Sequence, residues 1–172
     1  EISTASTRII LDFGNELSLD EKYIPINLDI DGVTKGLSDC DGIVISHYHM
    51  DHLGQLTSAL PEIPLYMGKL SKEVAMIATE HQDKDLYLRL LGANTFRGGE
   101  AFTIGNIHIR PLVIDHSAVD SYMFVIEAEG KRVLYTGDFR MHGLRSHIVE
   151  KLVKTYIGEV DVLITEGTLV SR

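Results

Sequence analysis

The chain has 172 residues, of which 44% are hydrophobic and 24% are charged. This composition is typical of one globular unit with a hydrophobic core, and it excludes a disordered or fibrous chain. No apolar run approaches the roughly 18 residues of a membrane-spanning helix, and no signal peptide is recognisable, so we expect no membrane partner. The net charge of −9 argues against a surface that binds nucleic acid through clustered lysines and arginines. The single cysteine, Cys40, cannot form an internal disulfide, so we expect a reducing, cytoplasmic setting.

Apolar periodicity and turn residues predict the elements of the first half of the chain. We expect a strand over 7–14, a loop with a short helix over 15–41, a strand over 42–45, a helix over 52–60, a strand over 63–67 and one helix from 71 to about 91.

The second half has the pattern of short strands joined by tight turns. We expect strands over 101–104, 107–114, 121–128, 132–138 and 161–167, and an amphipathic helix over 146–156 with Ile148, Leu152 and Val153 facing inward. No internal repeat or linker divides the chain.

The stretch SHYHMDH at 46–52 follows directly on the apolar run 42–45. Neutral imidazole and carboxylate are ligands of Zn²⁺, and also of Mn²⁺ or Fe. A lone histidine is more often a solvated side chain, but four such groups packed as HxHxDH after a buried strand predict a metal site. The candidate ligands are His47, His49, Asp51 and His52.

Other apolar runs also end in residues that can carry chemistry, namely Asp12, His116, Asp138 and Glu166. Strand ends that converge on one rim are how a sheet builds an active site. Each of these residues, taken alone, is equally consistent with a turn.

The order HxHxDH, then a distal His116, then Asp138 in a TGD context resembles the metallo-β-lactamase superfamily. The strings YTGDFR at 135–140 and ITEGT at 164–168 are similar to its β-CASP branch, and to ribonuclease J-type members in particular. The resemblance implies an α/β fold, an αββα sandwich with the metal site at one edge of the two sheets. Members carry a β-CASP insert and a later metal-ligating histidine that this chain lacks. We therefore expect residues 1–172 to be the N-terminal portion of a metallo-β-lactamase domain, without the β-CASP insert, from a longer chain.

The resemblance also implies which residues hold the metals. His47, His49 and His116 would hold one cation, and Asp51 and His52 a second, with Asp138 bridging the two. We expect two divalent ions, Zn²⁺ first and Mn²⁺ as the alternative.

Roles in the chemistry follow from the same resemblance. Asp51, His49 and Asp138 would be catalytic, with Asp51 accepting the proton of the attacking water. Asp12 would orient a metal ligand, although it is also a plausible turn residue. Ser117 would donate a hydrogen bond to a substrate phosphate, and Glu166 would orient His116 or another ligand through its ring N–H. The alternatives are a simple turn serine and an exposed carboxylate.

The function implied is a metal-dependent hydrolase, a ribonuclease J-like phosphodiesterase that cleaves RNA with metal-activated water. The absence of a basic patch favours a rival, a small-molecule metallohydrolase acting on a lactone or thioester. A non-catalytic binding module is the third reading. Without the β-CASP insert and the later histidine, we expect these residues alone to be inactive or impaired. A domain cut in half would also expose apolar surface, so we leave a homo-oligomer open.

Overall fold

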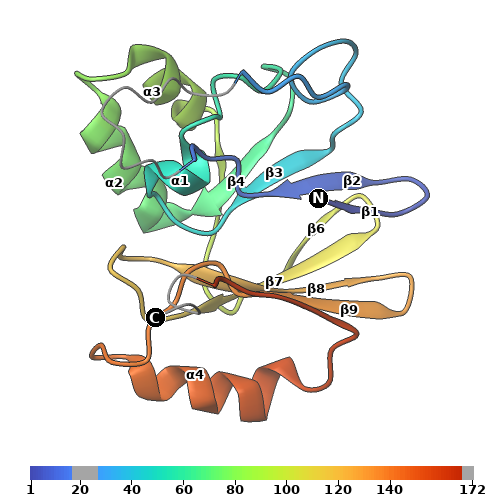
Figure 1. The fold of residues 1–172 in the computed structure, drawn as a ribbon, viewed down its shortest axis with the longest axis vertical. Helices are drawn as coiled ribbons and strands as arrows, with labels where there is room; N and C mark the ends of the chain where they lie inside the picture. Colours follow the sequence, from blue (N-terminus) through green and yellow to red (C-terminus); the bar gives the residue numbers. More distant parts are fainter. Residues whose placement is uncertain (17–26, 168–172) are drawn as a thin grey trace.

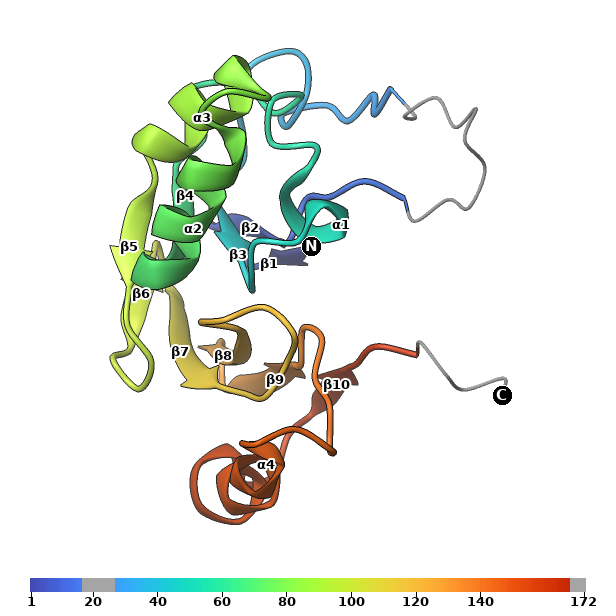
Figure 2. The same ribbon diagram turned by 90° about the vertical axis from the view of Figure 1, so that its left-hand side faces the viewer.

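Two five-stranded sheets pack face to face, and helices cover their outer faces (Figures 1 and 2). The computed structural model describes residues 1–16 and 27–167. The first sheet has the order β1-β2-β3-β4-β5, formed by Ile2–Ser3, Arg8–Leu11, Gly42–Ile45, Leu65–Gly68 and Asn94–Phe96. The second has the order β10-β9-β8-β7-β6, formed by β6 Phe102–Ile104, β7 Ile107–Val113, β8 Tyr122–Ala128, β9 Lys131–Tyr135 and β10 Val162–Ile164.

The helices lie on opposite sides of the sandwich. Figure 1 shows α1 (Met50–Leu53), α2 (Lys69–Thr79) and α3 (Lys84–Leu91) over the first sheet, and α4 (Ser146–Leu152) beyond the second. A π-helical turn, Val153–Ile157, continues α4. This arrangement confirms the predicted α/β sandwich. Within the described ranges, no helix is long and apolar enough to cross a membrane.

The alternation of side chains along each strand produces this layering. In β3, which is buried throughout, Ile43 and Ile45 pack in the core beneath the helices, whereas Val44 packs between the sheets. In β9, Val133 packs between the sheets and Leu134 packs against α4. Every central strand thus contributes to two cores.

Strands β2 to β5 run parallel, so their carboxyl ends meet at one edge of the first sheet. In the second sheet, β8 is antiparallel to both β7 and β9. The carboxyl ends of β7 and β9 therefore lie at a common edge too. The segments that leave β2, β3, β7 and β9 carry Asp12, the stretch 46–52, His116 and Asp138.

The prediction of one helix over 71–91 is wrong, because the chain breaks between α2 and α3. Asp83 caps α3 by accepting a hydrogen bond from the Leu86 amide at 3.0 Å, and such a side chain favours a new helix start over a continuing helix. The helix predicted over 52–60 is also shorter than expected. It forms as α1 and is followed by turns.

The helix predicted over 146–156 forms, but its buried face differs from the expectation. Val149, Leu152 and Ile157 are buried, Ile148 is partly buried, and Val153 is 52% exposed. The π-helical turn rotates the side chains after Leu152 relative to a regular helix. The loop predicted over 15–41 lies partly outside the described residues, and 27–41 contain no helix.

Candidate metal centre

Asp12 and the histidine-rich loop meet where β2 and β3 end. The Asp12 amide donates to the Val44 carbonyl at 2.9 Å, which extends the pairing of the two strands by one residue. The backbone of Asp12 then turns into the left-handed region, with φ of 56°, a conformation that aspartate tolerates better than most residues. The carboxylate is thereby turned toward the loop that follows β3.

A close backbone approach fixes the histidine-rich loop against this turn. A Cβ atom on Gly14 would lie 1.9 Å from the backbone of Asp51, so only glycine fits there. The Phe13 amide donates to the His52 carbonyl at 2.7 Å. Backbone contacts alone thus hold the loop and α1 against the turn after β2.

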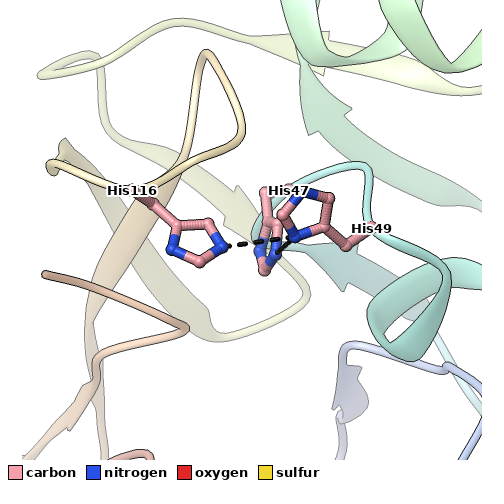
Figure 3. Close-up of side chains that lie close together, drawn as sticks. All are labelled: His47, His49 and His116. Carbon is pink, nitrogen blue, oxygen red and sulfur yellow. Dashed lines mark hydrogen bonds between the residues drawn. The ribbon is translucent and has the colours of Figure 1, made fainter. Parts of the chain in front are cut away.

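Three histidines from the two sheets converge at this edge (Figure 3). His47 Nε2 lies 3.0 Å from His49 Nδ1, and His116 Nε2 lies 3.2 Å from the same atom. Three nitrogens around one tetrahedral Zn²⁺, each at about 2.0–2.1 Å, would stand roughly 3.3–3.4 Å apart. The observed spacing is close to that value, so the group fits a single cation.

A second group of potential ligands shares His47 with the first. Ligand atoms of His47, His52 and Asp138 all lie within 4.8 Å of one another. His52 Nε2 is 3.4 Å from Asp138 Oδ2 and 3.5 Å from Asp51 Oδ2. Asp51 thus borders this group, and Asp138 Oδ2 also lies 3.8 Å from His116 Nε2. The donor set, imidazole nitrogen with carboxylate oxygen, suits a divalent cation here as well.

The Asp12 carboxylate determines which ring nitrogens face the two groups. It accepts hydrogen bonds from Ser46 N (2.6 Å), Ser46 Oγ (2.7 Å), His52 Nδ1 (2.8 Å) and Tyr135 Oη (2.5 Å). Because a carboxylate only accepts, His52 must carry hydrogen on Nδ1. Ser46 Oγ donates to Asp12 and is left to accept from His47 Nδ1 at 3.0 Å. Nε2 of both histidines is therefore turned toward the cluster, as in metal sites whose ligands are oriented by a carboxylate.

The pKa values of the two buried histidines, His47 and His52, shift in opposite directions. Burial, together with the neighbouring imidazoles, lowers the pKa of His47 to about 2. Burial also acts to lower the pKa of His52, but hydrogen bonds to Asp12 and Asp138 outweigh it and raise the pKa to about 10. The hydrogen bond with His52 in turn lowers the pKa of Asp138. Without a cation, His52 holds a proton that a metal ion binding there must displace.

Two of the predicted site residues lie at the rim of the cluster. Ser117 is exposed, and its hydroxyl lies 3.5 Å from His116 Nε2. Glu166 accepts a hydrogen bond from the Phe139 amide at 2.6 Å, so it holds the backbone next to Asp138. Its expected role in orienting a ligand ring stays a prediction.

No sequence pattern separately indicates a role for Ser46, Tyr135 or Asp115. The Asp115 side chain is 5% exposed and accepts hydrogen bonds from Arg140 Nε at 3.1 Å and from the Arg145 amide at 2.8 Å. These hydrogen bonds outweigh the effect of burial and lower the pKa of Asp115. The loop after Asp138 is thereby tied to the residue before His116. Position alone was the signal, since each of the three adjoins or closely precedes a ligand candidate.

Residues 9–172 match the family described as the Beta-lactamase superfamily domain. The chain is 29% identical, over 182 aligned residues, to the endoribonuclease ysh-1 of Neurospora crassa, covering 93% of this chain and 20% of that protein. It is 27% identical over 107 residues to ribonuclease J of Helicobacter pylori, covering 58% of this chain and 14% of that protein. The crystal structure of a protein of unknown function from Enterococcus faecalis superposes with a TM-score of 0.82 at 20% identity, over 99% of this chain and 46% of that one. The chain thus spans about one fifth of the length of its endoribonuclease relatives.

Proposed function

Because the chain belongs to the metallo-β-lactamase superfamily, we propose that it is part of a metal-dependent hydrolase that cleaves RNA phosphodiester bonds. The observation that carries the proposal is the convergence of His47 Nε2, His49 Nδ1 and His116 Nε2 within 3.0–3.2 Å contacts. The choice of RNA is supported by relatives named as an endoribonuclease and as ribonuclease J. Since those relatives are far longer, RNA cleavage is proposed for the protein to which this chain belongs.

We assign two divalent cations to the centre, with Zn²⁺ as the first expectation and Mn²⁺ as the alternative. His47, His49 and His116 would hold one ion. The second ion would be held by His52, Asp51 and Asp138. A ligand atom of His47 also lies within 4.8 Å of those of His52 and Asp138. When bound, such cations lower the pKa of water and neutralise charge on phosphate oxygens.

Buried and hydrogen-bonded side chains of this chain would hold the cations and orient their ligands. His47 is fully buried, so water does not compete for its inward-facing nitrogen. Asp12 keeps hydrogen on Nδ1 of His52, which leaves Nε2 for a cation.

The proton and the phosphate each have a candidate partner at the rim. The Asp51 carboxylate, 21% exposed and 3.5 Å from His52 Nε2, is the group we assign to take the proton of the attacking water. Ser117, with its exposed hydroxyl beside His116, is assigned to donate a hydrogen bond to a phosphate oxygen.

A small-molecule hydrolase is the rival function. The net charge of −9 favours it, because a protein that binds a polyanion usually carries clustered cationic side chains. A lactone or thioester needs no such surface. The same cation site would serve either substrate.

The test compares metal content and hydrolysis for this chain and for the full-length protein. Substrates are a bis-aryl phosphodiester, a short RNA, a lactone and a thioester. The variant His49→Ala with Asp138→Ala removes one ligand from each group. His81→Ala is its matched control, because the His81 side chain is 88% exposed and contacts no ligand residue.

We expect the full-length protein to bind about two cations and to cut RNA, and the double variant to lose both properties while His81→Ala keeps them. Hydrolysis of the lactone or thioester with RNA left intact would establish the rival. A full-length protein that binds no metal would refute both.

A further inference from the structure

We propose that Tyr135 is a positioning residue of the metal centre: its phenol, delivered from the second sheet, fixes Asp12 and through it the ligand His52. The inference rests on the metal site proposed above, but not on RNA as the substrate. Tyr135 lies on β9 and Asp12 at the end of β2, 123 residues apart in sequence.

The contact between these two residues is short and aimed at one oxygen. Tyr135 Oη donates to Asp12 Oδ2 at 2.5 Å, and His52 Nδ1 donates to the same oxygen at 2.8 Å. The Asp12 and His52 side chains are only 8% and 11% exposed. Ser46 Oγ donates to this oxygen as well, at 2.7 Å. Because the oxygen has three donors and little access to water, its position is set by all three partners.

The backbone of β9 holds the phenol in place. Tyr135 pairs with Phe124 of β8, and the two rings stack with an interplanar angle of 5° and centroids 6.4 Å apart. The Tyr135 ring packs in the core between the sheets. A phenol packed in this way has little freedom to move away from Asp12, so it keeps the Asp12 carboxylate in one position.

The same strand end also supplies a group on the opposite side of the His52 ring. Asp138 follows three residues after Tyr135, and its Oδ2 lies 3.4 Å from His52 Nε2. Nδ1 of the His52 ring thus donates to Asp12, which Tyr135 holds in place, and Nε2 of the same ring faces Asp138. We infer that β9 sets the spacing of the group formed by His52 and Asp138, while the phenol is linked to the other group through Asp12, Ser46 and His47.

Tyr122 provides a matched control within the same fold. It lies on β8, next to β9, and its hydroxyl donates to Asp120 Oδ1, also at 2.5 Å. Asp120 caps α2 through the Ser71 amide at 2.9 Å and contacts no member of the metal centre. Tyr135→Phe and Tyr122→Phe therefore each remove one hydroxyl from a short bond to a carboxylate, but only the Tyr135 hydroxyl bonds to a residue of the centre. The Tyr122 backbone amide, which donates to the Ser46 carbonyl at 3.1 Å, is kept in both variants.

The experiment titrates Co²⁺ into the chelator-treated full-length protein, as wild type and with either variant, and follows the visible absorption of the bound ion. Wild type should show two classes of site. Tyr135→Phe should weaken the class that contains His52 by about tenfold, the lower range for loss of a group that supports a ligand. The other class, which Asp12 reaches only through Ser46 Oγ and His47, should weaken less. Tyr122→Phe should leave both classes unchanged, although it lowers the urea midpoint as much as Tyr135→Phe does.

A second measurement needs no cation. The Ser46 amide donates to Asp12 Oδ1 at 2.6 Å, so its proton resonance reports the position of Asp12. This resonance should shift in Tyr135→Phe and stay in place in Tyr122→Phe.

Three outcomes would overturn the inference: unchanged Co²⁺ affinity in Tyr135→Phe, equal weakening in both variants, or no Co²⁺ binding by wild type. The last would also refute the metal site itself. A chain that binds Co²⁺ as expected but belongs to a protein that cuts no RNA would refute only the proposed substrate.

Discussion

Replacing Asp12 with asparagine tests whether one carboxylate organises the histidine cluster. Asparagine keeps the size of the side chain and tolerates the φ of 56° found here. The change therefore removes the charge and one acceptor without adding backbone strain.

The magnitude follows from the four bonds that Asp12 accepts. If the amide oxygen takes the place of Oδ2, which faces Ser46 Oγ, His52 and Tyr135, the amide NH₂ takes the place of Oδ1. It then faces the Ser46 amide at 2.6 Å, donor against donor. One buried donor left without a partner costs about 1–3 kcal/mol, and the other three bonds lose their charge assistance. We expect the free energy of unfolding to fall by about 3 kcal/mol in total.

Urea unfolding in the presence of a chelator measures this value, because bound cations would otherwise add their own stabilisation. Asp41→Asn is the matched control. Asp41 also accepts a backbone N–H, that of Arg8 at 2.8 Å, but at an exposed position, so its loss should cost less than about 1 kcal/mol. If Asp12→Asn lowered the free energy of unfolding no more than Asp41→Asn does, the Asp12 carboxylate would not be the group that organises the histidine cluster.

Gly137 has φ of 53° and a Cβ there would meet a carbonyl oxygen of β8 at 2.9 Å, so Gly137→Ala should lower the free energy of unfolding by about 2 kcal/mol. Gly130→Ala, with φ of 72° but open space around it, should cost only about 1 kcal/mol in the same urea experiment; equal costs would contradict the close contact. Asp83→Ala removes the cap of α3 and should cost about 1 kcal/mol, with a loss of helical circular dichroism; an unchanged midpoint would show that the cap does not define the helix start. In the chelator-treated chain, the low pKa of His47 makes the folded state less stable as the pH falls below about 6.5, because the unfolded state then binds a proton that the folded state does not. The high pKa of His52 stabilises the folded state below about pH 6.5, and this stabilisation is lost as the pH rises toward 10. The urea midpoint should therefore peak near pH 6.5, and a midpoint that rises steadily from pH 5 to pH 9 would refute this balance.

The local features of the centre were predictable because they depend on neighbours in the chain. The apolar run 42–45 is a buried strand, and the HxHxDH motif after it supplies His47, His49 and His52 within a few residues. A chain that leaves a buried strand places its next residues at the sheet edge. The hairpin formed by β8 and β9, with a turn at Glu129 and Gly130, was predictable for the same reason, since both turn residues adopt positive φ.

The break between α2 and α3 shows where local reasoning was insufficient. The apolar spacing on both sides of residues 80–83 is helical, and periodicity alone does not reveal that the first helix ends at Thr79 and that Asp83 caps the next. The exposed Val153 has a similar cause, because one π-helical turn changes which side chains face β7 and β8.

The connections between the sheets were decided by the tertiary structure alone. His49 meets His116 across 67 residues of sequence, and Asp12 meets Tyr135 across 123. Asp12 and Glu166 could be proposed as supporting groups from their positions at strand ends, but their hydrogen-bond partners could not. Periodicity fixes which face of a strand a side chain occupies, whereas the partner it meets depends on how two separately formed sheets pack against each other.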